Sequence, residues 1–156
     1  MIYNFLRPGP SPCRTPKHFD VGVAIDVSTS IGKEQFKLVN KFLEKFVAQF
    51  DIGPEQTHIG MLVYSSFAKL LHSPTDPAYQ TVASQEEAAR NVPYLMGGTR
   101  TDLALKKANE WFFSKEADRK YVPNVLVVLT DGRTNINSEP YSKVIPPLKV
   151  SSIWTV

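Results

Sequence analysis

Residues 19–27 read Phe-Asp-Val-Gly-Val-Ala-Ile-Asp-Val, and the next residues are Ser28-Thr29-Ser30. This apolar run is too short to span a membrane and is rich in Val and Ile, which predicts a strand buried on both faces of a sheet. An amphipathic helical pattern begins directly after it. Oxygen-bearing side chains between such a strand and a helix lie at the carboxyl edge of a sheet, where open α/β folds bind ligands.

The composition predicts one globular domain. The chain has 156 residues, of which 42% are hydrophobic and 21% charged, and its net charge is +3 from 18 basic and 15 acidic side chains. The basic residues are scattered, which argues against a nucleic-acid partner. No apolar run approaches the roughly 20 residues of a spanning helix, so no membrane span is expected in this chain. The first residues also have too short an apolar stretch for a signal peptide.

The amino-terminal stretch differs from the rest of the chain. Residues 1–17 contain Pro8, Pro10, Pro12 and Pro16, which predicts a Pro-rich linker, and the domain is expected to occupy residues 18–156. Cys13 is the only cysteine, so no internal disulfide can form. A lone cysteine is either an inert thiol or half of a bridge to something outside this chain.

The remaining pattern alternates strands with helices. Strands are predicted over residues 57–64, 125–130 and 151–156, and residues 68–71 are expected to return as a short antiparallel edge strand. Helices are predicted over 32–50, over 84–92 from a capping box at Ser84-Gln85-Glu86-Glu87, and over 102–114, with one helical turn over 141–145. This alternation is typical of an α/β doubly wound, mostly parallel sheet with helices on both faces.

Oxygen donors cluster at three places beside these strands. The donors are Asp26, Ser28 and Ser30 after the first strand, Thr99 with Thr101 behind it in a Gly-rich turn, and Asp131 after the strand 125–130. None of them is His or Cys, and such a set suits a hard cation such as Mg²⁺. Two carboxylates balance a divalent ion, whereas hydroxyls add no charge. The sequence therefore predicts a metal site that can accept a carboxylate from outside.

Each of these residues also has a simpler interpretation. Ser30 could cap the helix that follows it, and Thr99 or Thr101 could cap the helix over 102–114. Asp131-Gly132 could be an ordinary turn. Asp26 is harder to explain in this way, because a carboxylate that ends a buried strand needs a partner.

Three segments together resemble the von Willebrand factor type A domain, also called the integrin I domain. They are Val21-Gly22-Val23-Ala24-Ile25 running into Asp26-Val27-Ser28-Thr29-Ser30, the turn Gly97-Gly98-Thr99-Arg100-Thr101, and Val127-Val128-Leu129-Thr130-Asp131-Gly132. The resemblance implies a metal-ion-dependent adhesion site. In it Ser28, Ser30 and Thr99 would bind Mg²⁺ (or Mn²⁺) directly. Asp26 and Asp131 would act mainly through waters, and a Glu or Asp of a protein ligand would complete the coordination sphere.

The resemblance further implies a non-enzymatic, extracellular protein-binding module for cell adhesion or matrix interaction, with collagen or another matrix protein as a possible partner. Lys33, Arg100 and Arg133 form a candidate rim that could steer acidic ligands toward the metal. Relative to the family, the last strand and last helix are expected to be missing after Val156. In many secreted members a cysteine before the first strand pairs with one after the last helix, and Cys13 is the candidate for the first of these.

Three other functions remain open at this stage. Asp-x-Ser could be a phosphatase-like nucleophile loop, although such chemistry usually needs a second acid where this chain has Ser28. A serine hydrolase would need a base, and none of His18, His58 and His72 has evident Ser and acid partners. The fold could also serve as a structural matrix module whose metal site is not used.

Overall fold

The computed structural model describes residues 17–156. The linker predicted over residues 1–17 therefore falls outside the described residues except for Lys17, as does Cys13. The centre of the domain is a five-stranded sheet of order β3-β2-β1-β4-β5. The strands are β1 (Asp20–Asp26), β2 (His58–Tyr64), β3 (Ala68–His72), β4 (Asn124–Leu129) and β5 (Ser152–Thr155). Only β3 is antiparallel to its neighbour.

β1, the strand predicted from residues 19–27, is the middle strand of the sheet. Hydrogen bonds join β1 to β2 on one side and to β4 on the other, with Ile25 opposite both Val63 and Leu129. All seven residues of β1 are buried, as its continuous apolar character predicts. Its carboxyl end, Asp26, therefore lies next to the ends of β2 and β4.

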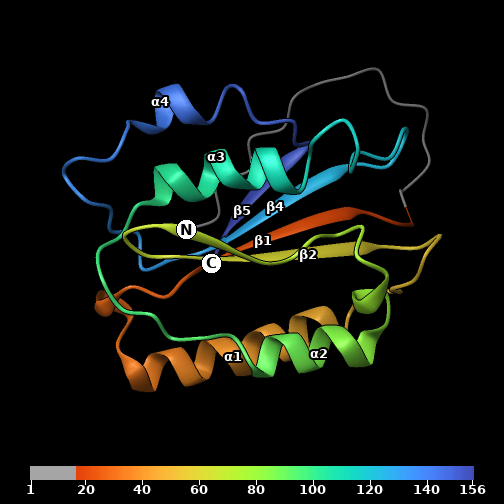
Figure 1. Ribbon diagram of the computed structural model, residues 1–156, viewed down its shortest axis with the longest axis horizontal. Coiled ribbons are helices and arrows are strands. Elements are labelled where there is room, and N and C mark those ends of the chain that lie inside the picture. Colours follow the sequence, from red (N-terminus) through yellow and green to blue (C-terminus); the bar gives the residue numbers. More distant parts are fainter. Residues whose placement is uncertain (1–16) are drawn as a thin grey trace.

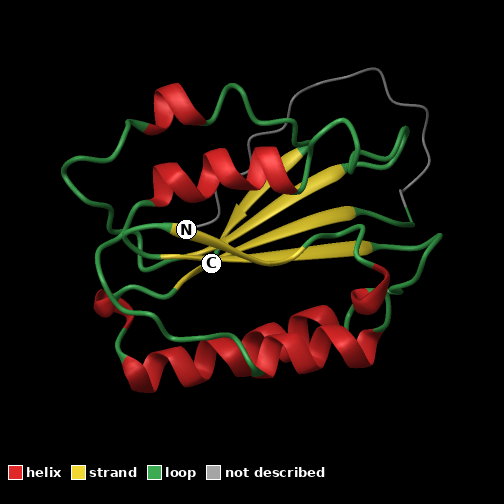
Figure 2. Cartoon of the chain, viewed as in Figure 1, coloured by secondary structure: helices red, strands yellow, loops and turns green. Residues whose placement is uncertain are grey.

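Helices cover both faces of the sheet (Figure 1). The helices α1 (Lys33–Val47) and α2 (Val82–Arg90) lie on one face, and α3 (Thr101–Trp111) and the single turn α4 (Tyr141–Val144) lie on the other. Short 3-10 turns occupy Thr29–Ile31 and Pro77–Tyr79. Figure 2 shows that loops gather at both ends of the strands. The predicted doubly wound α/β fold with one antiparallel edge strand is confirmed.

Alternate residues of β1 contact the two helical layers. Val21, Val23 and Ile25 belong to the core beneath α1 and α2, and Ala24 belongs to the core beneath α3. Glycine is required on the α3 side, because a Cβ added to Gly22 would lie 2.4 Å from Cδ2 of Phe112. The ring at the end of α3 can rest directly on the sheet only because Gly22 has no side chain.

The structure corrects several helix boundaries. α2 begins at Val82, not at Ser84, because the capping box is formed by Thr81 and Ser84. The N–H of Ser84 donates to Oγ1 of Thr81 at 3.1 Å, and the N–H of Thr81 donates to Oγ of Ser84 at 3.3 Å. A hydroxyl thus fills the role that a Glu or Gln usually has in this motif. α1 ends at Val47, since the following N–H groups of Gln49 and Phe50 return to carbonyls three residues back.

Among the described residues, no helix has the length and apolar character needed to cross a lipid bilayer.

Candidate functional site

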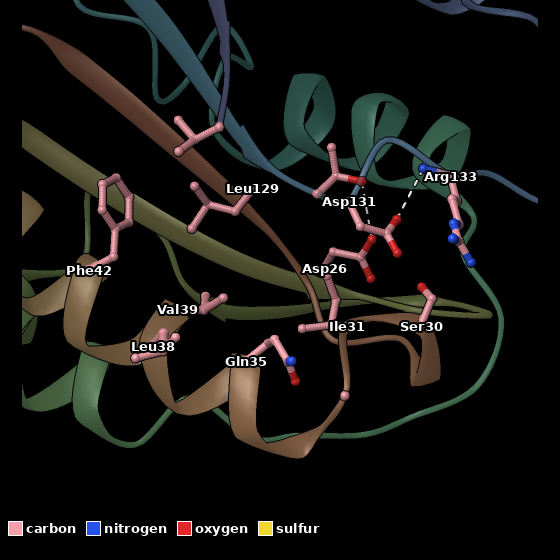
Figure 3. A pocket seen from close by; sticks show the side chains of 13 residues that line it. Asp26, Ser30, Ile31, Gln35, Leu38, Val39, Phe42, Leu129, Asp131 and Arg133 are labelled. Carbon is pink, nitrogen blue, oxygen red and sulfur yellow. Dashed lines mark hydrogen bonds between the residues drawn. The ribbon is translucent and has the colours of Figure 1, made fainter. Parts of the chain in front are cut away.

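Asp26 and Asp131 come from neighbouring parallel strands and approach each other at the carboxyl edge of the sheet. Figure 3 shows the two carboxylates side by side, with Ser30 close to them. Thr130 directly precedes Asp131 in the chain, and its hydroxyl donates to Oδ2 of Asp26 at 3.2 Å. The same hydroxyl accepts the N–H of Gly132 at 3.1 Å. Thr130, which was not among the predicted site residues, therefore fixes the Asp131 turn against Asp26.

The loop after β1 brings its three oxygen-bearing side chains together. The N–H of Ser28 donates to Oδ1 of Asp26 at 2.9 Å, which turns the chain back over the carboxylate. The hydroxyls of Ser28 and Ser30 lie 2.9 Å apart. Ser30 does not cap α1, whose N-cap is Gly32 without a side-chain hydrogen bond. The simpler interpretation of Ser30 as a helix cap is therefore wrong.

Thr99 is held in place by the loop that follows Asp131. Its N–H donates to Oδ1 of Asn135 at 3.0 Å, and its carbonyl accepts the N–H of Asn135 at 2.9 Å. The carbonyl also accepts the hydroxyl of Thr134 at 3.2 Å. Thr99 is 5% exposed, and α3 has Arg100 as its N-cap without a side-chain cap, so neither Thr99 nor Thr101 caps this helix. Sequence reasoning missed Asn135, and no local pattern distinguishes it from its polar neighbours.

Hydrogen bonds join the Gly-rich turn to the loop after β1 and to the turn after β2. The N–H of Thr29 donates to the carbonyl of Gly97 at 3.0 Å, and the N–H of Gly97 donates to Oγ1 of Thr29 at 2.9 Å. The N–H of Arg100 donates to the carbonyl of Ser65 at 2.8 Å. The segments that carry Ser28, Ser30 and Thr99 are therefore tied to one another across the sheet edge.

Asp131 has an ordinary turn function as well. Its Oδ1 accepts the N–H of Arg133 at 3.0 Å, which is the hydrogen bond of an Asx-turn, and Gly132 adopts a φ of 82°. The turn leaves the other carboxylate oxygen available. Unlike Asp26, which is 1% exposed, Asp131 is open to solvent.

The electrostatics of the two carboxylates favour a cation. Burial raises the pKa of Asp26, hydrogen bonds from Ser28 and Thr130 lower it, and the charge of Asp131 raises it further. Within residues 17–156, neither carboxylate forms an ion pair with a basic side chain. Tyr64 lies opposite Asp26 on β2 with its side chain fully buried, and burial and the charge of Asp26 raise the pKa of its hydroxyl. A divalent cation would offset both the repulsion between the two carboxylates and the cost of burying the charge of Asp26.

The three candidate rim residues are placed differently. Lys33 begins α1 and is exposed. Arg133 is also exposed, and together with Asp131 it lines the groove described below. Arg100 forms a two-pronged ion pair with the fully buried Asp102, with Nε–Oδ1 at 2.9 Å and Nη2–Oδ2 at 2.8 Å. The backbone N–H of Glu139 also donates to Asp102 at 3.1 Å. A carboxylate at an apolar helix position was the sequence signal that could have identified Asp102.

A groove of about 670 Å³ extends from the carboxylates along α1. Its polar end contains Asp26, Ser30 and Asp131, and its apolar wall includes Leu38 and Leu129 (Figure 3). The donor set at the polar end contains hydroxyls and only two acids, and no cluster of three or more His, Cys, Asp or Glu occurs in residues 17–156. This composition fits a cation that prefers oxygen and retains several waters.

The three histidines of residues 17–156 do not have the surroundings of a catalytic base. His58 Nε2 lies 2.9 Å from the carbonyl of Pro54, and His72 stacks on Tyr79 with ring centroids 4.1 Å apart. The buried Nδ1 of His18 has no hydrogen-bond partner among residues 17–156. No hydrogen bond joins any of these rings to a serine hydroxyl within residues 17–156, so the arrangement of a serine hydrolase does not form there.

The fold and the site define a doubly wound α/β domain with a hydroxyl- and carboxylate-lined centre at the carboxyl ends of its parallel strands. The von Willebrand factor type A domain family matches residues 20–156. The chain belongs to this family, as the three motifs predicted.

Relatives include collagen and matrilin chains. The human collagen alpha-1(XXI) chain is 33% identical over 124 residues, which cover 80% of this chain and 12% of that protein. Matrilin-1 of Gallus gallus is 35% identical over 131 residues, which cover 81% of this chain and 26% of that protein. The chain therefore spans about a quarter or less of the length of these relatives.

Solved structures show the same fold. Proximal thread matrix protein 1 from the mussel byssus, in a structure described with a zinc-occupied MIDAS motif, has a TM-score of 0.70 at 26% identity, covering 81% of this chain and 32% of that one. The von Willebrand factor domain of the pilus tip protein Mfa5 from Porphyromonas gingivalis has a TM-score of 0.63 at 20% identity, covering 78% and 40% of the two chains. The second likeness concerns the fold alone.

Proposed function

We propose that this domain binds a protein partner through a divalent cation, Mg²⁺ or Mn²⁺, held at the carboxyl edge of its sheet. Ser28, Ser30 and Thr99 supply hydroxyl ligands, and Asp26 and Asp131 supply the negative charge, mainly through bound waters. The cation, when bound, offers an electrophilic position to a Glu or Asp of the partner. The domain thus acts as a binding module and not as an enzyme.

One observation carries this proposal: two carboxylates at the ends of neighbouring strands lie together next to paired serine hydroxyls, and neither has a basic partner within residues 17–156. Two unpaired carboxylates this close repel each other, and the burial of Asp26 adds to the cost. A cation in contact with hydroxyls retains most of its charge, because hydroxyls neutralise none of it. It can therefore attract an outside acid, which a site built only from carboxylates would repel.

The proposed setting is the extracellular matrix or cell surface. It is supported by the relationship to collagen and matrilin chains, and a matrix protein such as collagen is the first partner class to test. Lys33 and Arg133, both exposed near the site, would attract acidic ligands. Arg100 contributes less to this attraction because Asp102 compensates its charge.

The direct test measures unfolding in urea at increasing Mg²⁺, with EDTA as reference. A ligand that binds only the folded state at about 100 times its dissociation constant stabilises that state by about 2.7 kcal/mol. Asp26→Ala and Ser30→Ala are expected to lose this stabilisation. Asp51→Ala, which changes an exposed aspartate far from the sheet edge, is the matched control.

Partner binding is tested on the same proteins with immobilised collagens and other matrix proteins. Capture is expected in Mg²⁺ and is expected to disappear in EDTA and in Asp26→Ala. Equal capture in EDTA would contradict metal-dependent adhesion and would favour a structural module whose metal site is not used. Absence of any Mg²⁺ effect on unfolding would contradict the metal site itself.

A further inference from the structure

We infer that the partner segment presents apolar side chains next to its acidic residue, and that these contact four exposed residues of this domain: Phe67, Leu95, Met96 and Ile136. We call these four residues the apolar rim. This inference rests on the proposed function and adds the chemical class of the partner segment to it.

The four side chains of the apolar rim are exposed to solvent although all of them are apolar. Phe67 and Met96 are each 54% exposed, Leu95 is 36% exposed and Ile136 is fully exposed. Single exposed apolar residues are common on protein surfaces and need no explanation. These four, however, all belong to loops at the edge of the sheet that holds the candidate metal site. Such grouping around a polar centre is typical of interaction surfaces.

Hydrogen bonds connect the apolar rim to the candidate ligands. The N–H of Gly98 donates to Oγ of Ser66 at 2.8 Å, which joins the turn before Phe67 to the loop after Met96. Gly97 is bound in turn to Thr29, between Ser28 and Ser30. The segments that carry Leu95, Met96 and Phe67 are therefore joined to the loop that carries Ser28 and Ser30.

Ile136 belongs to the loop on another side of the site. It follows Asn135, whose two hydrogen bonds hold Thr99. Because hydrogen bonds hold these loops to the site, their backbone needs little further ordering when a partner binds. The entropy cost of binding is therefore small, which favours affinity.

The backbone at Met96 is consistent with such a display. Met96 adopts a φ of 57°, a left-handed conformation that non-glycine residues rarely adopt. The chain turns here so that Gly97 can meet Thr29, and the side chain of Met96 stays largely in solvent although an apolar side chain gains from burial. An occupant that covers Met96 would recover this loss.

The chemistry of the surface selects one kind of occupant. Residues 65–68 and 93–99 contain no charged side chain. A basic or acidic flank that covers Phe67, Leu95 and Met96 would therefore lose water without gaining a charged partner from these two segments. The nearby charges of Arg133 and Glu139 lie on the loop that carries Ile136. An apolar flank loses nothing comparable and gains contact with Phe67 and Met96. The matching segment has Glu or Asp at its centre and Leu, Ile, Met or Phe beside it.

The test uses three short biotinylated peptides at high density on a sensor surface. The first has a central Glu flanked by Leu and Phe, the second has the same Glu flanked by Ser, and the third has Gln flanked by Leu and Phe. In Mg²⁺ the first peptide is expected to bind about tenfold more tightly than the second, a discrimination that a few apolar contacts supply. The double variant F67S/M96S is expected to bind both Glu peptides equally. Tyr121→Ser removes an 89% exposed side chain outside the apolar rim and is the matched control, with the tenfold preference retained.

Each other result has a definite meaning. Equal, Mg²⁺-dependent binding of the two Glu peptides to the unaltered domain overturns this inference and leaves the proposed function intact. Lack of Mg²⁺-dependent binding by any peptide overturns both. Equal binding of the Gln peptide in EDTA would show non-specific binding and overturns the inference. Sedimentation in which the unaltered domain dimerises while F67S/M96S stays monomeric overturns it as well, because the apolar rim would then be a dimer interface. If F67S/M96S unfolds, Ile136→Ser at the fully exposed position replaces it, with partial loss of preference expected.

Discussion

Asn135 binds both backbone polar groups of Thr99. Its side-chain oxygen accepts the N–H of Thr99 at 3.0 Å, and its own N–H donates to the carbonyl of Thr99 at 2.9 Å. These two bonds link the Gly-rich turn to the loop after Asp131, and they fix the backbone from which the Thr99 hydroxyl extends. Two of the three loops of the candidate metal site are thereby held in one arrangement before any cation binds.

Removal of the Asn135 side chain is expected to weaken Mg²⁺ binding. In Asn135→Ala the buried N–H of Thr99 loses its acceptor, and the loss of a group that orients a metal ligand typically weakens metal affinity by about tenfold or more. The apparent dissociation constant is measured by the Mg²⁺ dependence of urea unfolding. Asn135→Asp keeps an acceptor oxygen and is expected to recover part of the affinity. Asn137→Ala changes an exposed residue of the same loop and serves as control; unchanged Mg²⁺ affinity in Asn135→Ala would contradict this role.

Arg100 is expected to matter for stability more than for attraction of ligands. Its guanidinium holds the pKa of the buried Asp102 well below its usual range, and Arg100→Ala leaves that carboxylate without its main partner. The midpoint of urea unfolding at pH 7 should fall clearly. Arg133→Ala, at an exposed position, should leave the midpoint nearly unchanged. Equal midpoints for the two variants would show that the buried ion pair contributes no stability.

Gly22→Ala is expected to destabilise the domain by about 1–3 kcal/mol, the usual cost of overpacking a core. The added methyl group would collide with the ring of Phe112. Urea unfolding measures the loss, and the double variant with Phe112→Leu should recover part of it. Gly53→Ala is the matched control, because its methyl group meets only the flexible end of Gln56. If the double variant were as unstable as Gly22→Ala alone, the contact with Phe112 would not be the cause of the destabilisation.

His72 is expected to make the domain sensitive to mild acid. Burial lowers the pKa of His72 to about 4 from its ordinary value of 6.5, and its ring stacks on Tyr79. Between these two values the unfolded chain binds a proton that the folded chain does not, so stability falls as the pH drops from about 6.5 toward 4 and is unaffected above that window. The full loss is about 3 kcal/mol.

The comparison is made with His72→Phe, which keeps an aromatic ring and cannot titrate. The free energy of unfolding is measured at several pH values between 4.5 and 7.5. The difference between the two proteins should change with pH only below about 6.5. Parallel pH profiles would exclude the buried histidine as the source of the acid sensitivity.

Local patterns in the sequence were sufficient for the main elements. The continuous Val and Ile run predicted β1 as a strand buried on both faces, and alternation of strands with helices predicted the doubly wound sheet, because apolar character and periodicity are visible within a short window of sequence. The three loop motifs identified the family and the candidate metal ligands. Helix ends were less certain: the Thr81–Ser84 capping box uses a hydroxyl where the pattern expects a Glu or Gln.

The order of residues along the chain thus determined the fold class, the central strand and the set of oxygen-bearing side chains. Only the tertiary structure decided how these side chains are held: Asn135 binds a residue 36 positions away, and Thr130 binds one 104 positions away. It also decided that hydrogen bonds join the turn before Phe67 to the loop after Met96, and the loop that carries Ile136 to Thr99. The physical reason is that such contacts form between loops brought together by strand pairing, and no short stretch of sequence contains both partners.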